Sequence, residues 1–198
     1  MKCLIIAHGP SWLKELDKAK DFDGIIIACD VCTPETLEAG IIPDYIVTLE
    51  SAKTNVLGKF FPIEQLTKHK DDIKVIGSPM TRGDIEDIIV STGMEFERFT
   101  FDEASHCSNV GIFAINYARH ELKADNVVLL GFDHCGTGGV GNVDDMVENN
   151  HINYRTWQTD FWYFVKKWEP FYVINCTNGG VLYNDDLIRT ADLSDFSK

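Results

Sequence analysis

The sequence is poor in basic residues, and those it has form no block. Eighteen Lys and Arg stand against 31 Asp and Glu, which gives a formal net charge of −13. Binding along the backbone of DNA or RNA relies on clustered Lys and Arg, so we expect no extended nucleic-acid interface. A small anionic ligand stays open, because backbone amides and one or two side chains can hold a phosphate inside an acidic protein.

Long apolar runs are also missing. No stretch approaches the ~18 apolar residues that a membrane span requires, and the first residues lack the basic region, apolar segment and cleavage site of a secretory signal. We therefore expect a soluble, cytoplasmic protein without a membrane span. Internal repeats, linkers and low-complexity segments are absent too, so residues 1–198 are expected to form one domain.

The cysteines lack the partners of a zinc site. Cys29 and Cys32 have CxxC spacing, but no second CxxC and no His pair with zinc-finger spacing accompanies them. Most of the six cysteines fall in or beside apolar runs, as reduced core thiols do in a cytosolic protein. We predict core thiols rather than a zinc site or redox pair at Cys3, Cys29, Cys32, Cys107, Cys135 and Cys176.

What the sequence does contain is a series of short apolar runs that alternate with helical patterns. Strands are predicted at 3–7, 24–29, 45–49, 73–77, 95–101, 126–133 and 170–175, with 95–101 at an edge of the sheet. A continuously apolar strand is covered on both faces, which is typical of a parallel sheet between helices. The prediction is a single Rossmann-like α/β domain with a mostly parallel sheet and helices on both faces.

The first strand breaks at once into the turn His8-Gly9-Pro10-Ser11. Gly9 permits a sharp turn or a close approach to a ligand, Pro10 fixes φ, and Ser11 is a favourable N-cap for the helix that follows. A helix start at the end of a parallel strand presents free N–H groups that suit a phosphate. The turn is therefore either a phosphate or ribose site or a capped turn without a ligand.

Polar residues also follow other predicted strands. Asp30 and Asp133 each end an apolar run, and the end of the run before Asp133 is expected beside the first turn. Ligands of open α/β sheets bind beyond the carboxyl ends of the strands, so both are candidate nucleotide-binding residues; Asp133 could bind ribose or a metal, or it could cap a loop. Ser108 and Asn109 open a strong helix and are predicted to face the phosphate. The Gly-rich residues 135–150 are expected to form a lid or an inserted surface loop.

An aromatic-rich helix is predicted from residue 156 to 168. Its aromatic side chains recur at helical spacing, which is more typical of a core or of a homo-oligomer contact face than of a base-stacking platform. They are Trp157, Phe161, Trp162, Phe164 and Trp168.

Several segments occur in a characteristic order: HGPS, EAGIIPDYIVT, SNVGIFAINYA leading to VVLLGFD, and NCTNGG. Together they resemble the 6-hydroxymethylpterin diphosphokinase-like family, which includes the flagellin motility accessory factors. The same arrangement is similar to bacterial sialyltransferases that begin with a Gly-Asn-Gly-Pro-Ser turn. The likeness covers most of the chain, and order and spacing make it specific. It implies a nucleotide or a nucleotide-sugar donor as the ligand.

The likeness to sialyltransferases implies a glycosyltransferase-like enzyme that uses a nucleotide-activated sugar, such as a CMP-sugar. Those enzymes place a His after a mobile lid and before a helix, and His151 has that position here. By this resemblance His151 is the general base that deprotonates an acceptor hydroxyl, and imidazole titrates in the appropriate range. A solvated loop histidine is the alternative. His8 and Asp30 stand where the family has Asn, so the nucleotide itself stays open.

The likeness to diphosphokinases implies pyrophosphoryl transfer from ATP with Mg²⁺, held by acidic residues that follow the strand at 45–49. Among residues 48–51 only Glu50 is acidic, so Asp133 would have to supply the second ligand. A third interpretation is a nucleotide-binding module without catalysis, which the departures at His8 and Asp30 favour.

Overall fold

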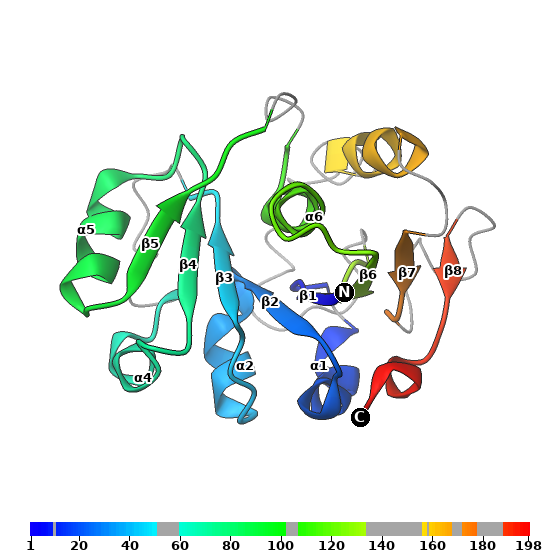
Figure 1. Ribbon diagram of the computed structural model, residues 1–198, viewed down its shortest axis with the longest axis horizontal. Helices are drawn as coiled ribbons and strands as arrows, with labels where there is room; N and C mark the ends of the chain where they lie inside the picture. Colours follow the sequence, from blue (N-terminus) through cyan, green and yellow to red (C-terminus); the bar gives the residue numbers. More distant parts are fainter. Residues whose placement is uncertain are drawn as a thin grey trace, which may run out of the picture.

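The computed structural model describes residues 1–9, 11–50, 60–101, 107–133, 156–157, 159–167, 172–177 and 188–198. Their strands form one sheet in the order β5-β4-β3-β2-β1-β6-β7-β8 (Figure 1), and every pairing between these strands is parallel. The predicted α/β fold with a parallel sheet is confirmed. The strands are β1 (Lys2–Ile6), β2 (Ile25–Cys29), β3 (Tyr45–Thr48), β4 (Lys74–Gly77), β5 (Glu95–Arg98), β6 (Asn126–Leu130), β7 (Val173–Asn175) and β8 (Arg189–Thr190).

Helices cover both faces of the sheet. Figure 1 shows α1, α2 and α4 on one face, and α6 with the helical residues 156–157 and 159–167 on the other. The α-helices are α1 (Trp12–Glu15), α2 (Thr33–Glu38), α4 (Ile63–Lys68), α5 (Gly83–Ser91) and α6 (Val110–His120). Short 3-10 helices are η1 (Leu16–Asp21), η2 (Asp30–Cys32) and η4 (Leu193–Phe196).

The core is built around β1, which lies between β2 and β6 near the middle of the sheet. Leu4, Ile5 and Ile6 are fully buried, because β2 and β6 pair with β1 along both of its edges and helices cover its faces. Burying one such side chain contributes about 1.5–3 kcal/mol to folding. The continuous apolar run that predicted this strand thus follows from its burial on both faces.

A second apolar cluster stabilises the half of the sheet that contains β3 and β4. It joins α4 and α5 to the sheet through eight buried side chains. They are Ile46, Phe61, Leu66, Ile73, Val75, Ile85, Ile89 and Met94.

Two elements differ from the sequence-based expectations. The first helix is α-helical for only four residues and continues as the 3-10 helix η1. The sheet also gains β8, which the sequence did not predict, because Arg189–Thr190 is two residues long and carries no apolar alternation. The expected edge position of the strand at 95–101 is confirmed by β5.

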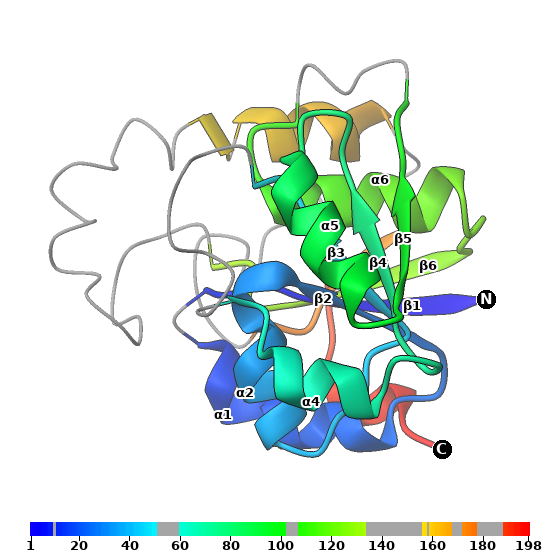
Figure 2. The ribbon, with the colours of Figure 1, turned by 90° about the vertical axis from the view of Figure 1, so that its left-hand side faces the viewer.

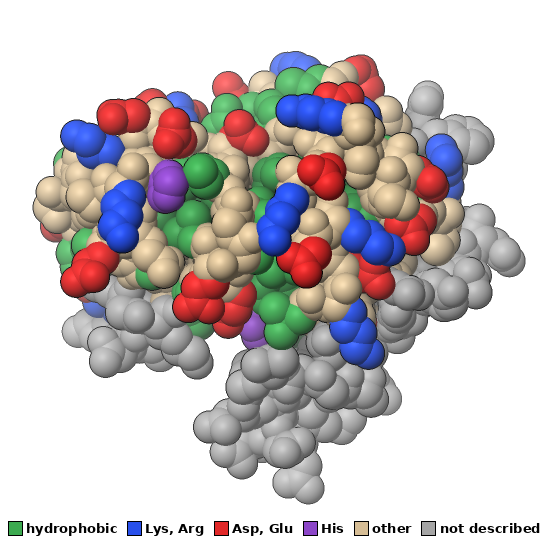
Figure 3. All heavy atoms as spheres, turned by 90° about the horizontal axis from the view of Figure 1, so that it is seen from below, with side chains coloured by type: hydrophobic (Ala, Val, Ile, Leu, Met, Phe, Trp, Pro, Cys, Tyr) green, Lys and Arg blue, Asp and Glu red, His purple; other side chains and the backbone are tan. Residues whose placement is uncertain are grey.

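All strands point from one edge of the sheet, where both chain ends lie, towards the opposite carboxyl edge (Figure 2). On the face seen in Figure 3, Lys and Arg side chains are interspersed with Asp and Glu rather than gathered. Ion pairs between such side chains occur in the structure: Lys18 pairs with Glu15 at 2.7 Å and with Asp192 at 3.0 Å. Within the described residues, no helix has the length and apolar character needed to cross a membrane.

Candidate functional site at the carboxyl edge of the sheet

The strand order reverses direction at β1. From β1 the chain adds β2, β3, β4 and β5 on one side and then returns to place β6 on the other. In open α/β sheets such a reversal leaves a crevice beyond the carboxyl ends of the two strands, and ligands bind there. The segments after β1, β2 and β6 contain His8, Gly9, Ser11, Asp30 and Asp133, so the fold gathers these predicted site residues at one edge.

The first turn lies directly against the segment that follows β6. Ala7 N donates to Leu130 O at 2.8 Å, and Gly9 N donates to Gly131 O at 2.8 Å. The predicted closeness of these two strand ends is therefore confirmed. A Cβ atom on Gly9 would lie 2.1 Å from an Asp133 carboxylate oxygen, so only glycine fits this approach.

The Asp133 carboxylate is bound to the first turn through Ser11. Ser11 Oγ donates to Asp133 Oδ2 at 2.9 Å, and Ser11 N lies 3.3 Å from the same oxygen. Ser11 occupies the predicted N-cap position of α1, although its side chain makes no capping hydrogen bond within the described residues. Burial raises the pKa of Asp133, which is 2% exposed, and the bonds from Ser11 oppose this shift. The Ser11 N–H and O–H groups, which would suit a phosphate, thus bind the Asp133 carboxylate instead.

His8 lies beside the same turn. Its ring packs at a tilt against Trp12, with 5.6 Å between the ring centroids. Trp12 is buried and His8 is half-buried, so the core fixes one side of the imidazole.

Asp30 forms a second buried carboxylate at the end of β2. Thr48 Oγ1 donates to Asp30 Oδ2 at 2.6 Å, and Val31 N donates to Asp30 Oδ1 at 2.8 Å. Burial raises the pKa of Asp30 to about 6; the two hydrogen bonds lower it, and the nearby charge of Glu50 raises it. Asp30 is 6% exposed, so its ionised form is held in place by these donors rather than by water.

The start of α6 contains the other two predicted residues. Asn109 is the N-cap, and its Oδ1 accepts a hydrogen bond from Ile112 N at 3.0 Å. Ser108 O accepts from Trp157 Nε1 at 3.1 Å, while the buried Ser108 Oγ has no hydrogen-bond partner among the residues that the structure describes. Asn109 therefore serves its own helix in this structure.

Close packing joins the start of α6 to the segment after β6. A Cβ atom on Gly111 would lie 2.9 Å from the Phe132 ring, and Phe132 is 3% exposed. The residues Gly131–Asp133 thus contact both the turn that follows β1 and the start of α6.

A family model described as 6-hydroxymethylpterin diphosphokinase MptE-like matches residues 1–139. The chain belongs to the MptE-like family. The matched residues include β1 to β6 and every predicted site residue except His151. The resemblance to the 6-hydroxymethylpterin diphosphokinase-like family is therefore confirmed. Among curated proteins, none matches the chain significantly.

Solved structures share the fold at low identity. The MAf glycosyltransferase from Magnetospirillum magneticum AMB-1 matches with a TM-score of 0.61 and 16% identity over 97% of this chain. This chain spans 33% of the length of that protein. A protein from Lactobacillus plantarum matches at 15% identity with a TM-score of 0.36, over 87% of this chain and 57% of its own. The first of these matches supports the fold of this MptE-like chain.

The structure does not bring Glu50 and Asp133 together. They follow β3 and β6, and β2 and β1 lie between those strands. Three strand spacings of about 4.8 Å separate the two strand ends by on the order of 14 Å, whereas Mg²⁺ binds its oxygen ligands at about 2.1 Å. The strand order therefore argues against a Mg²⁺ ion shared by these two carboxylates, and the assignment stays a prediction. Among the described residues, no group of three or more His, Cys, Asp or Glu side chains could hold a metal ion.

Two threonines at the same edge were not predicted as site residues. Thr48 binds the Asp30 carboxylate, and the Thr177 hydroxyl accepts a hydrogen bond from Phe132 N at 3.0 Å. Both residues are fully buried. The signal that could have found them is a hydroxyl residue at or just after the end of a buried strand, at the edge where ligands bind.

Three predicted features of the site involve residues that the structure does not describe. These are Pro10 in the first turn, the general base His151, and the lid or loop at 135–150. Their assignments stay predictions.

The described cysteines are core thiols, as predicted. Cys3, Cys29, Cys32 and Cys176 are buried and Cys107 is half-buried, and all five are free thiols. Burial raises the pKa of Cys3 to about 11 and those of Cys29 and Cys32 well above their ordinary value. A raised pKa opposes the thiolate that metal binding and redox chemistry need.

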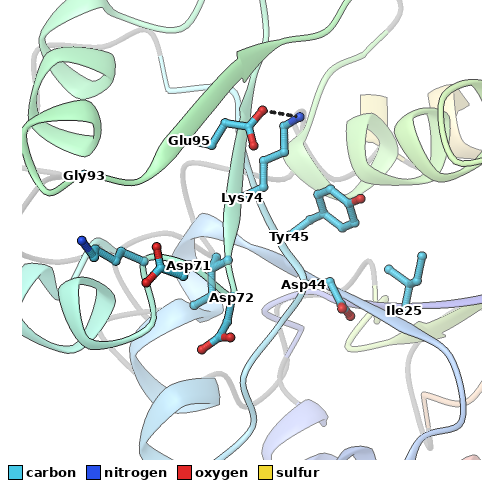
Figure 4. Close-up of a pocket in the computed structure, with 10 residues that line it drawn as sticks. Ile25, Asp44, Tyr45, Asp71, Asp72, Lys74, Gly93 and Glu95 are labelled. Atoms are coloured by element: carbon cyan, nitrogen blue, oxygen red, sulfur yellow. Dashed lines mark ion pairs between the residues drawn. The ribbon is translucent and has the colours of Figure 1, made fainter.

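A hollow of about 450 Å³ lies at the opposite, amino edge of the sheet (Figure 4). Some of its charged groups are already paired: Lys74 contacts Glu95 at 2.8 Å, and Asp44 accepts a hydrogen bond from Ile26 N. Because ligands of this fold class bind at the carboxyl edge, this hollow is not part of the candidate site.

Proposed function

We propose that this chain is a glycosyltransferase-like enzyme that binds a nucleotide-activated sugar across the carboxyl ends of β2, β1 and β6. The observation that carries the proposal is the pair of buried carboxylates, Asp30 and Asp133, on either side of the β1 end. Carboxylates accept hydrogen bonds from sugar hydroxyls and from amino groups on a base, and they repel phosphate. They therefore suit the nucleoside part of such a ligand.

The arrangement of donors also favours a position for the phosphate. Because Asp133 already holds Ser11 N and Oγ, the phosphate is assigned to the start of α6, near Ser108 and Asn109, rather than to the first turn. His8 and the backbone of Gly9 would line the nucleoside. The fold of the MAf glycosyltransferase supports a transferase of this type.

The proposed chemistry is displacement at the anomeric carbon. His151 takes the proton of an acceptor hydroxyl while the oxygen attacks that carbon, and the nucleotide leaves with the electron pair of the broken bond. Imidazole is suited to this step because its pKa lies near neutral pH. Inversion of the anomeric carbon comes from the resemblance to sialyltransferases.

Nucleotide binding without metal is the first expected result. Isothermal titration of CMP, CDP, UDP, GDP and ATP, each in EDTA and in Mg²⁺, should show binding of a cytidine nucleotide in EDTA, because the buried carboxylates require no metal to accept hydroxyl hydrogen bonds. Asp71→Asn, an exposed residue at the amino edge, is the matched control for Asp30→Asn, which should weaken binding. Binding of ATP alone, and only with Mg²⁺, would contradict this proposal.

Loss of the proposed base should affect turnover and not binding. His151→Ala is expected to lower the rate of sugar transfer from the donor that binds by at least about 100-fold, the lower range for general-base catalysis, while leaving donor affinity unchanged. His69→Ala, at the end of α4, is the control. Unchanged turnover in His151→Ala would refute the assignment of the base.

The family description favours a second candidate, 6-hydroxymethylpterin diphosphokinase activity. That reaction uses Mg²⁺, and the strand order, which separates Glu50 from Asp133, argues against an ion shared by these two residues. The third candidate, a nucleotide-binding module without catalysis, is favoured by His8 and Asp30, which replace Asn of the family. Nucleotide binding without turnover over a wide range of acceptors would support it.

A further inference from the structure

The candidate site depends on the position of three residues, Gly131–Asp133. Gly131 O accepts from Gly9 N, and Asp133 Oδ2 accepts from Ser11. A displacement of this segment would therefore move the first turn and the Asp133 carboxylate together.

The backbone between these two contacts is held from β7. Phe132 N donates to Thr177 Oγ1 at 3.0 Å, across 45 positions of sequence, and Thr177 is fully buried. Phe132 N–H is also buried, so without this hydroxyl it would lose its acceptor in a place that water does not reach. The Thr177 side chain thus fixes the centre of the segment.

Thr177 is itself held in a defined position. Cys176 N donates to Leu129 O at 2.8 Å, which extends the pairing of β7 with β6 beyond β7. Thr177 N donates to Asn175 Oδ1 at 3.0 Å, and Asn175 is fully buried. Among the described residues, the Nδ2 atom of Asn175 has no hydrogen-bond partner, so burying this amide costs free energy. Stability alone does not explain an asparagine here, whereas orientation of Thr177 does.

We propose that Thr177 is a positioning residue for the nucleotide site: oriented by Asn175, it holds Gly131–Asp133 so that Asp133 and the first turn keep their binding geometry. This inference rests on the proposed function for the identity of the ligand. The contact itself rests on the hydrogen bonds alone.

The experiment combines two readouts on Thr177→Val and Thr177→Ser. Valine has the shape of threonine without the hydroxyl, and serine keeps the hydroxyl. Amide hydrogen exchange by NMR reports Phe132 and Gly9 in the site and Leu4 in the core, and isothermal titration in EDTA reports the affinity for CMP.

In Thr177→Val we expect exchange about tenfold faster at Phe132 and Gly9 and about tenfold weaker binding of CMP, in keeping with one lost buried hydrogen bond, while Leu4 reports the accompanying change in global stability. Thr177→Ser should restore all three values. Unchanged exchange at Gly9 or CMP affinity that does not follow the hydroxyl would each overturn the proposal.

Two further outcomes are separated by the same design. If the wild-type protein binds no CMP, the donor assignment fails, and exchange at Gly9 still decides whether Thr177 holds the first turn. If Thr177→Val does not fold, native-state exchange of the wild type decides: Phe132 and Gly9 should open as one unit with equal free energy. Opening of Gly9 at much lower free energy would overturn the proposal.

Discussion

Replacement of Gly131 by alanine is expected to destabilise the protein by on the order of 4 kcal/mol, within the range reserved for the most disruptive substitutions. Gly131 has a φ of +77°, and a Cβ atom there would lie 2.0 Å from Ala7 O and 2.8 Å from Trp12 Cβ. The positive φ alone costs about 1 kcal/mol for alanine. The larger part comes from separation of the first turn from the segment after β6.

Urea unfolding at neutral pH measures this effect, and two other glycines serve as controls. Gly40 has nearly the same φ, +78°, with no atom within 4 Å of a Cβ, so Gly40→Ala should cost only about 1 kcal/mol. Gly83 lies in open space, and Gly83→Ala should change stability little. If Gly131→Ala costs no more than Gly40→Ala, the close approach of the two segments is not essential.

Replacement of Asp30 by asparagine should stabilise the protein above pH 6 and leave it unchanged near pH 4. The pKa of Asp30 is raised from 3.8 to about 6 in the folded protein, so the protonated form favours folding. That contribution is fully present below pH 3.8 and is lost as the pH rises through about 6. A shift of about two units corresponds to about 3 kcal/mol at pH 8, which a neutral asparagine would recover.

The measurement is urea unfolding of the wild type and Asp30→Asn at pH 4, 6 and 8. Subtracting the free energy of unfolding of the wild type from that of Asp30→Asn at each pH removes the effects of the other titrating groups. Asp71→Asn, at an exposed position, should give no difference at any of these pH values. If Asp30→Asn raised the free energy of unfolding equally at all three pH values, ionisation of Asp30 would not be unfavourable in the folded protein.

These two predictions concern opposite requirements of the same site. Gly131 lets two backbone segments meet, and its replacement is expected to remove stability. Asp30 places a carboxylate where ionisation is unfavourable, and its replacement is expected to add stability. A residue whose removal stabilises the fold is better explained by ligand binding than by folding, because sites of function commonly carry such a cost.

The fold could be predicted from sequence because its signals are local. An apolar run of five or six consecutive residues, such as the one that forms β1, indicates a strand that is buried on both faces. Gly9 and Asp133 could be found in the same way, since each directly follows a run of this kind. β8 could not, because two polar residues at the edge of a sheet bury too little apolar surface to leave a pattern.

The sequence by itself determined the parallel α/β architecture, the edge at which polar residues gather and the family to which the chain belongs. Only the tertiary structure decided how those polar residues are used. The Ser11 hydroxyl binds Asp133, 122 positions away, rather than its own helix, and Thr177 holds Phe132 across 45 positions. The strand order likewise separates Glu50 from Asp133. Such contacts depend on which strands are neighbours in the sheet, and a local pattern of residues does not indicate which strands will be neighbours.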